Sequence, residues 1–283
     1  MATKRKGMVN LSRPGYFVYG SLAAVMIASL FPFYWSFLIG SGDASTIRDP
    51  NMSWLPGGNF FANASTVINA DAVNFWKALG NSLIVSTTVS ITTVVLSTLA
   101  GYAFAKLRFK GSNWLFVAVI ATMAVPVQLG VVPLYIIMSR YGWTGSLWAV
   151  IIPALVTAFG VFWMTQYMQQ SLPTELIEAA RVDGCNMIRT FWHVAIPAVR
   201  PAAAMLFLFT FVQSWNNFFW PFIVLDQSNP TLPVALSILQ ASYFVDYSLV
   251  LAGVLLATVP LLILFIFTGR QLVSGIMAGA VKG

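Results

Sequence analysis

Six long apolar stretches without a charged residue in their interior constrain the fold of this chain most strongly. A helix needs about 20 apolar residues to cross the hydrocarbon core of a membrane. Backbone amides in lipid must find their partners within the chain, and the alternating pattern of barrel strands is absent. The sequence therefore predicts an all-α membrane protein with six transmembrane helices in a single domain, residues 1–283. The predicted spans are 16–39, 83–105, 114–138, 147–168, 202–221 and 249–269.

The composition agrees with a membrane protein. Hydrophobic residues make up 58% of the chain and charged residues 8%, which leaves too few polar groups to cover a soluble globule. The basic N-terminus and the apolar run after it have the order of a signal peptide, but the run is too long and lacks a small-residue cleavage pattern, so we expect a retained first span. A single cysteine, Cys185, excludes an internal disulfide, and no CxxC pair or other metal-binding pattern occurs.

The basic residues predict the orientation. With the N-terminus inside, the inner segments hold twelve of the fifteen Lys and Arg residues, so both termini are expected in the cytoplasm. The charges do not form a basic surface with interleaved aromatic residues, and we expect no nucleic-acid partner. The inner residues are Lys4, Arg5, Lys6, Arg13, Lys106, Arg108, Lys110, Arg181, Arg189, Arg200, Arg270 and Lys282, and the outer ones are Arg48, Lys77 and Arg140.

Several functions are disfavoured by what the spans lack. They contain no ionisable residue, which weakens a proton-driven mechanism, although sodium coupling through backbone carbonyls stays open. The chain has no GxxxxGK[ST] phosphate loop, no GxSxG turn and no HExxH pair, so a membrane enzyme acting from loop residues is a minor alternative. If the protein moves a solute uphill, another chain supplies the energy.

One polar stretch separates the fourth and fifth spans. Residues 173–197 are predicted to form two short cytoplasmic helices that join at Asp183-Gly184, the second ending at Pro197. The stretch can lie in the lipid headgroups or dock on a partner. Small residues favour docking, because Ala179, Ala180 and Gly184 leave room for close contact.

This stretch carries a family resemblance. Glu178-Ala179-Ala180, Asp183-Gly184, Phe191, Ile196-Pro197 and Pro201 match the EAA loop pattern of ABC importer permeases. GYAFAKLRFKG, SWNNFFWPFIVL and GRQLVSGIMAGAVKG are similar to the carbohydrate-uptake branch, in particular the second permease of maltose-type importers. The chain departs from that pattern at Asn217, where Glu is common, and at Cys185, where Ala is usual.

The resemblance implies a bacterial cytoplasmic (inner) membrane protein that transports and does not itself catalyse. Its partners would be a homologous second permease, two ATPase subunits that hold ATP and Mg, and an extracytoplasmic sugar-binding protein, with membrane lipid around the spans. This chain would need no cofactor. The EAA helix would seat in an ATPase cleft, with Glu178 and Asp183 fixing its orientation. The cytoplasmic tail, residues 270–283, would enter between the ATPases through Gly275, Gly279 and Lys282.

Polar residues inside the spans indicate where a solute would pass. Amide groups and aromatic faces bind sugars, and the predicted pathway residues are Gln128, Gln213, Trp215, Asn216 and Asn217. The same amides could instead bond helices to one another. A permease for another solute and a stand-alone secondary carrier remain as alternatives to a sugar importer. Pro126, Pro153 and Pro260 are candidates for kinks.

Overall fold

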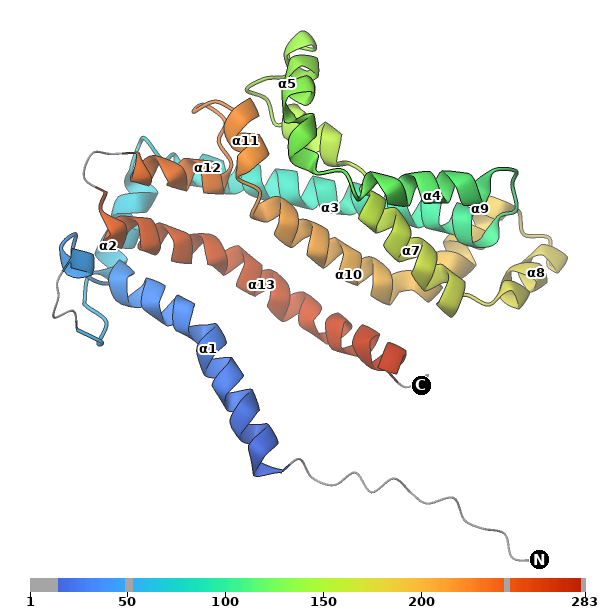
Figure 1. Cartoon of the computed structure of the whole chain (residues 1–283), viewed down its shortest axis with the longest axis horizontal. Helices are drawn as coiled ribbons and strands as arrows, with labels where there is room; N and C mark the ends of the chain where they lie inside the picture. The colour runs from blue at the N-terminus through green and yellow to red at the C-terminus, as the bar shows by residue number, and fades with distance from the viewer. Residues whose placement is uncertain (1–14, 49–52, 242–244, 281–283) are drawn as a thin grey trace, which may run out of the picture.

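The protein is an elongated assembly of helices (Figure 1). The computed structural model describes residues 15–48, 53–241 and 245–280, except the side chains of residues 48 and 269–280, and this part of the chain contains no strand. The all-α architecture predicted from the sequence is confirmed. The main helices are α1 (Tyr16–Gly40), α2 (Phe60–Asn69), α3 (Phe75–Lys106), α4 (Ser112–Thr122), α5 (Val131–Arg140), α6 (Trp148–Ile151), α7 (Ala158–Ser171), α8 (Thr174–Val182), α9 (Met187–Thr190), α10 (Ile196–Trp215), α11 (Phe219–Val224), α12 (Leu232–Ser237) and α13 (Tyr247–Ala280), joined in places by the short turns η1 (Thr46–Arg48), η2 (Val127–Gly130), η3 (Ile152–Ala154), η4 (Phe191–Ala195) and η5 (Ile238–Gln240).

Five helical segments among the described residues are long and apolar enough to cross a membrane, or six if one bent pair counts as a span. The bent pair replaces the predicted straight span 114–138. α4 and the segment Val127–Arg140 meet at 89°, and α5 projects away from the helices beside it (Figure 1). Pro126 lies in the break with extended backbone. Because proline disfavours helical backbone in the residue before it and cannot donate to the preceding turn, an apolar run of sufficient length is split here.

α3 occupies the centre of the fold and packs against α7 and α10. A row of small polar side chains on its inner face is almost fully buried: Ser82, Ser86, Ser90, Thr93 and Ser97. Small residues let helix backbones approach closely in membranes. At Gly101 a Cβ atom would lie 2.8 Å from the Cβ of Met164 on α7, so only glycine permits this crossing.

Three tryptophan indoles tie neighbouring helices together. Each Nε1 donates a hydrogen bond to a backbone carbonyl of another segment, at 2.9 to 3.1 Å. A buried indole needs such a partner, and these carbonyls lie where small alanine side chains leave them accessible. The pairs are Trp163 with Ala202, Trp215 with Ala257 and Trp220 with Ala149.

The boundaries of the fifth span differ from the prediction. The helix does not stop at Pro197: α9, the π-helical turn η4 and α10 form one segment, Met187–Trp215. A π turn is wider than an α turn, and it removes the conflict between the ring of Pro197 and the preceding carbonyls. At the other end the helix finishes at Trp215 and not at residue 221, because Asn216 and Asn217 form a turn before α11.

Candidate functional site

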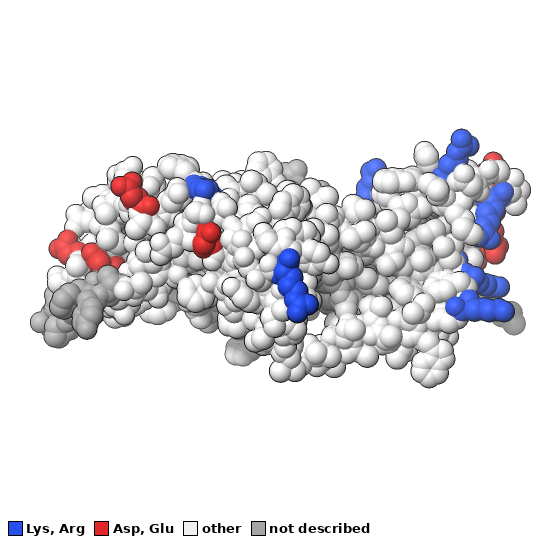
Figure 2. Space-filling model, turned by 90° about the horizontal axis from the view of Figure 1, so that it is seen from above, with Lys and Arg blue, Asp and Glu red and all other residues white. Residues whose placement is uncertain are grey.

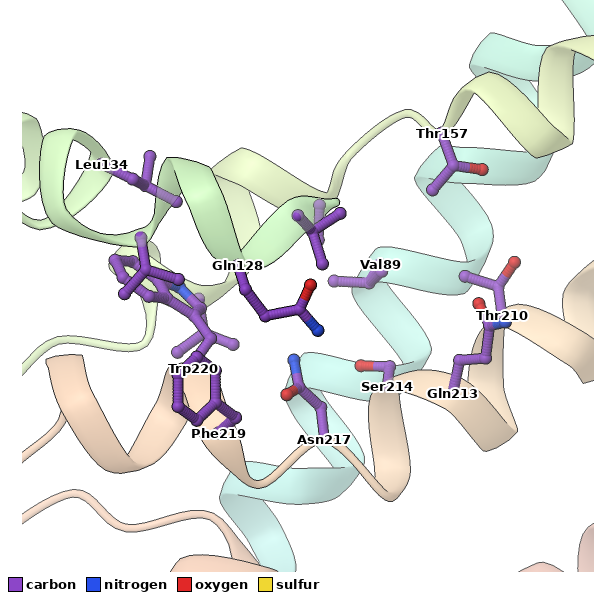
Figure 3. Close-up of a pocket in the computed structure, with 14 residues that line it drawn as sticks. Val89, Gln128, Leu134, Thr157, Thr210, Gln213, Ser214, Asn217, Phe219 and Trp220 are labelled. Atoms are coloured by element: carbon purple, nitrogen blue, oxygen red, sulfur yellow. The ribbon is translucent and has the colours of Figure 1, made fainter. Parts of the chain in front are cut away.

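The principal candidate site is a cavity of about 430 Å³ enclosed by α3, the bend between α4 and α5, the η3–α7 connection and the end of α10. Figure 3 shows Gln128 and Asn217 pointing toward one another across it, with Ser214, Thr210 and Thr157 farther along the wall. Apolar side chains complete the lining. Three of the predicted pathway residues, Gln128, Gln213 and Asn217, therefore share one cavity.

The amides of this cavity differ from an amide that joins helices. Asn81 is 7% exposed and its Nδ2 donates to the carbonyl of Pro230 at 2.9 Å. Gln128, Gln213 and Asn217 are exposed to the cavity, and within the described part of the chain their side chains make no hydrogen bond. Their donors and acceptors are free to bind a solute or a second protein.

Two aromatic residues of the cavity, Phe219 and Trp220, were missed by the sequence analysis. The turn at Asn216-Asn217 ends α10, and α11 starts in a new direction. The helical periodicity of α10 therefore does not predict which side chains of α11 face the cavity. Trp220 is fixed by its bond to Ala149 and contributes ring surface. The consecutive asparagines were the available signal for this change of direction.

Trp215 and Asn216 lie away from this cavity. Trp215 is 2% exposed, bonds to α13 through Ala257, and stacks on Phe211 with ring centroids 5.7 Å apart. With Asn216 it borders a separate hollow of about 370 Å³ between α10, α12 and α13. The five predicted pathway residues are thus divided between two hollows, because adjacent residues at a helix end point in different directions.

None of the described residues that line the principal cavity is ionisable. The polar atoms it offers are amides and hydroxyls, and the rest of its wall is aliphatic or aromatic. Such a surface can bind neutral polar groups by hydrogen bonds and ring faces by stacking, but it provides no counter-charge for an ion.

The second candidate region is the loop between α7 and α10. Helix α8 ends at Val182, and Gly184, two residues later, has a φ of +79°, the left-handed conformation that favours glycine. The Cys185 amide donates to the Ala180 carbonyl at 2.9 Å and the Gly184 amide to that of Arg181 at 3.0 Å. This pair of bonds is a Schellman motif, and it fixes the reversal of the chain between α8 and α9.

The two alanines of this loop have different environments. Ala180 is 8% exposed and lies on the inner face of α8 with Ile177, whereas Ala179 is exposed beside Glu178. Helix periodicity turns Ala180 toward the protein, so of the two alanines predicted to take part in coupling, Ala179 is the one that this structure leaves exposed. Gly184 has open space around it, with Asp183 exposed next to it.

The loop is held to the spans by an aromatic contact. Phe191 is buried against Tyr102 of α3, with ring centroids 5.4 Å apart, in the same apolar cluster as Ile177. Packed side chains therefore connect α8 to α3 and α10. Pro197, predicted as a coupling residue, is exposed on α10.

Charged residues divide along the molecule. Figure 2 shows most of the Lys and Arg side chains at one end. That end holds the C-terminus of α3, the loop before α4, and the α8–α9 loop, which together carry Lys106, Arg108, Lys110, Arg181 and Arg189. Of the predicted tail contacts, Gly275 and Gly279 lie in the last turns of α13, and Lys282 lies outside the described residues.

Taken together, the fold and the cavity define a polytopic membrane protein with a neutral polar site large enough for a solute. Residues 93–272, more than half of the chain, match the family described as binding-protein-dependent transport system inner membrane component. The chain belongs to that family, which confirms the resemblance inferred from its loop.

Similar proteins include sugar permeases. The arabinooligosaccharides transport system permease protein AraQ of Halalkalibacterium halodurans is 36% identical over 217 residues, or 76% of this chain and 77% of the relative. The lactose transport system permease protein LacG of Rhizobium radiobacter is 33% identical, covering 95% and 97% of the two chains. A solved structure of a bacterial ABC transporter involved in import of the acidic polysaccharide alginate shares the fold, with a TM-score of 0.75, 22% identity, and coverage of 91% of this chain and 99% of that chain.

Proposed function

We propose that this chain is a permease subunit of an ATP-driven importer of sugars or oligosaccharides, and that its principal cavity forms part of the translocation pathway. The observation that carries the proposal is the chemistry of the cavity wall, where the described residues supply unpaired amides and ring surfaces but no ionisable group. Phosphate, polyamine or amino-acid substrates would need charged partners in such a site. The sugar permeases AraQ and LacG among the relatives support the same substrate class.

The cavity wall would form one half of the translocation pathway. Its amides lack partners among the described residues, as expected if a homologous second permease closes it. An extracytoplasmic sugar-binding protein would deliver the solute. The basic end of the molecule would face the cytoplasm, with both termini on that side and the membrane a bacterial cytoplasmic membrane.

Helix α8 would transmit the conformational change of the ATPase subunit to the spans. Its exposed residues Glu178, Ala179 and Asp183 would contact an ATPase subunit, whose bound ATP and Mg drive the cycle, and a second ATPase would bind the partner permease. The Schellman turn and the Phe191–Tyr102 contact support this assignment, because a lever transmits force only if its base is fixed. The helical end of α13, including Gly275 and Gly279, would reach toward the ATPases together with Lys282.

Reconstitution of the full assembly tests the proposal. The chain is purified with its neighbouring permease, ATPases and binding protein, placed in vesicles, and supplied with a panel of radiolabelled solutes. We expect ATP-dependent uptake of a neutral sugar or oligosaccharide. Uptake without ATP by this chain alone would identify a secondary carrier, and uptake only of a solute that is not a sugar would refute the sugar assignment.

A further inference from the structure

A third hollow, distinct from the one beside Trp215 and also of about 370 Å³, lies on the outward face of α7. Its lining consists of Phe162, Trp163, Gln166, Tyr167 and Gln170. Amides and aromatic rings therefore occur together here as they do in the principal cavity. The sequence analysis did not select these residues, because Gln166 and Gln170 stand near the end of an apolar run.

The two glutamines lack partners in the described part of the chain. Their side chains make no hydrogen bond there, although they lie in the segment Trp148–Ser171, which is apolar enough to span a membrane. Thr165, on the opposite face of α7, is buried and donates to the Val161 carbonyl at 2.7 Å. An amide left unpaired in lipid costs about 2–7 kcal/mol, so this face of α7 must be turned away from lipid.

The hollow lies farther along α7 than the principal cavity does. Thr157, at the start of α7, and Thr210 and Gln213, on α10, line that cavity. Phe209, the residue before Thr210, packs edge-on against Trp163 with ring centroids 6.2 Å apart. Because Trp163 already donates its indole N–H to Ala202, it offers the hollow only ring surface.

We propose that this strip, Trp163, Gln166 and Gln170, is a second oligosaccharide-contact site, on the cytoplasmic half of the pathway. The hollow lies between the principal cavity and the basic end of the molecule, since α7 runs from Ala158, next to the cavity residue Thr157, to Ser171 just before the α8 loop. A sugar ring would stack on Trp163 while the two amides bond its hydroxyl groups. This inference rests on the proposed function, because it assigns the exit side of the same pathway.

Thiol accessibility tests the site directly. In the complete assembly with Cys185→Ala as background, Gln166→Cys and Gln170→Cys are treated with a charged, membrane-impermeant thiol reagent from the cytoplasmic side, with Ile263→Cys on an apolar face of α13 as the matched control. We expect both α7 thiols to react, the control to stay unmodified, and the transported oligosaccharide to slow the α7 reactions. Unreactive thiols at 166 and 170 would overturn the proposal and indicate glutamines buried against the partner permease.

Uptake by side-chain variants provides the second readout. Gln166→Leu should lower oligosaccharide uptake by roughly 3- to 10-fold, the value of one hydrogen bond, with Gln166→Asn less affected. Stimulation of ATP hydrolysis by the loaded binding protein should persist, since Gln166 lies on α7 and not on the exposed face of α8. Normal uptake by Gln166→Leu would contradict the site alone, whereas absence of sugar uptake by the unmodified assembly would contradict the proposed function.

Discussion

At the scale of single residues, Gly184 combines a backbone requirement with an exposed position. Its φ of +79° costs a residue with a side chain about 1–2 kcal/mol, while the space around it is open. We predict that Gly184→Asp retains membrane insertion and loses sugar-stimulated ATP hydrolysis, measured on the reconstituted assembly. Gly184→Asn separates the two causes, because Asn tolerates this conformation and adds no charge. Normal uptake by Gly184→Asp would argue against docking through the loop.

Trp215 is expected to matter for stability through one hydrogen bond. Trp215→Phe preserves most of the ring packing on Phe211 but leaves the Ala257 carbonyl without its donor. The Ala257 carbonyl lies within helix α13, so the loss is that of one hydrogen bond, about 0.5–1.5 kcal/mol, which thermal unfolding in detergent would register as a lower midpoint. The matched control is Trp114→Phe, whose side chain is 82% exposed. Equal midpoints for the two variants would mean that the bond to α13 contributes nothing.

At the scale of helices, substitutions of two adjacent alanines on α8 can separate an effect on ATPase binding from an effect on folding stability. Ala179→Arg places bulk on the exposed face and should abolish ATPase binding while the chain stays folded. Ala180→Arg forces a charge among buried neighbours and should lower the thermal stability of the purified chain. Binding to the purified ATPase and unfolding midpoints distinguish the two. If Ala179→Arg binds normally, the exposed face of α8 is not the contact.

The loop after α11 contains a carboxyl group, Asp226, whose pKa shift gives its contribution to stability a defined pH dependence. Hydrogen bonds from the Ser228 hydroxyl and from the backbone N–H groups of Ser228 and Asn229 lower the pKa of Asp226 below its ordinary value. The stabilisation is present above the unfolded-state pKa and is lost as the pH falls through the lower folded-state value. Ser228→Ala should raise the pKa of Asp226, observed by carboxyl-carbon NMR with Asp226→Asn for assignment. An unchanged titration would refute the role of the hydroxyl.

The helices themselves were more predictable from the sequence than their interruptions. Length and hydropathy identify α1, α3 and α13, because lipid leaves a long apolar segment little alternative to a helix. Length and hydropathy do not specify the 89° bend after α4 or the π turn before Pro197. Both depend on how neighbouring segments supply hydrogen-bond partners to the backbone groups around a proline. The end of α10 was placed too late for a related reason: residues 216–221 are apolar enough for a span, but the turn at Asn216 redirects them.

The candidate site could be predicted in its chemistry but not in its assembly. Rare amides within apolar runs pointed correctly to polar hollows, and Gln128, Gln213 and Asn217 do share one. Which amides meet depends on three segments far apart in the sequence, and this arrangement has no local signal. Ala180 illustrates the same limit: the motif marks it as important, while only the fold shows that it faces inward.

For the whole molecule, the separation of charges makes a prediction about orientation. Most Lys and Arg side chains lie at the end that carries the α8 loop (Figure 2), and positively charged segments are retained in the cytoplasm. In a chain that carries Cys185→Ala, the cysteine of a Lys110→Cys variant should therefore react with a membrane-impermeant thiol reagent only in inside-out vesicles. A thiol at Lys77, near the opposite end of α3, should react only in right-side-out vesicles or intact cells. α3 is one continuous helix, so Lys77 and Lys110 must be labelled from opposite sides if α3 spans the membrane. Labelling of both positions from the same side would contradict the proposed membrane orientation, on which the pathway and the coupling loop depend.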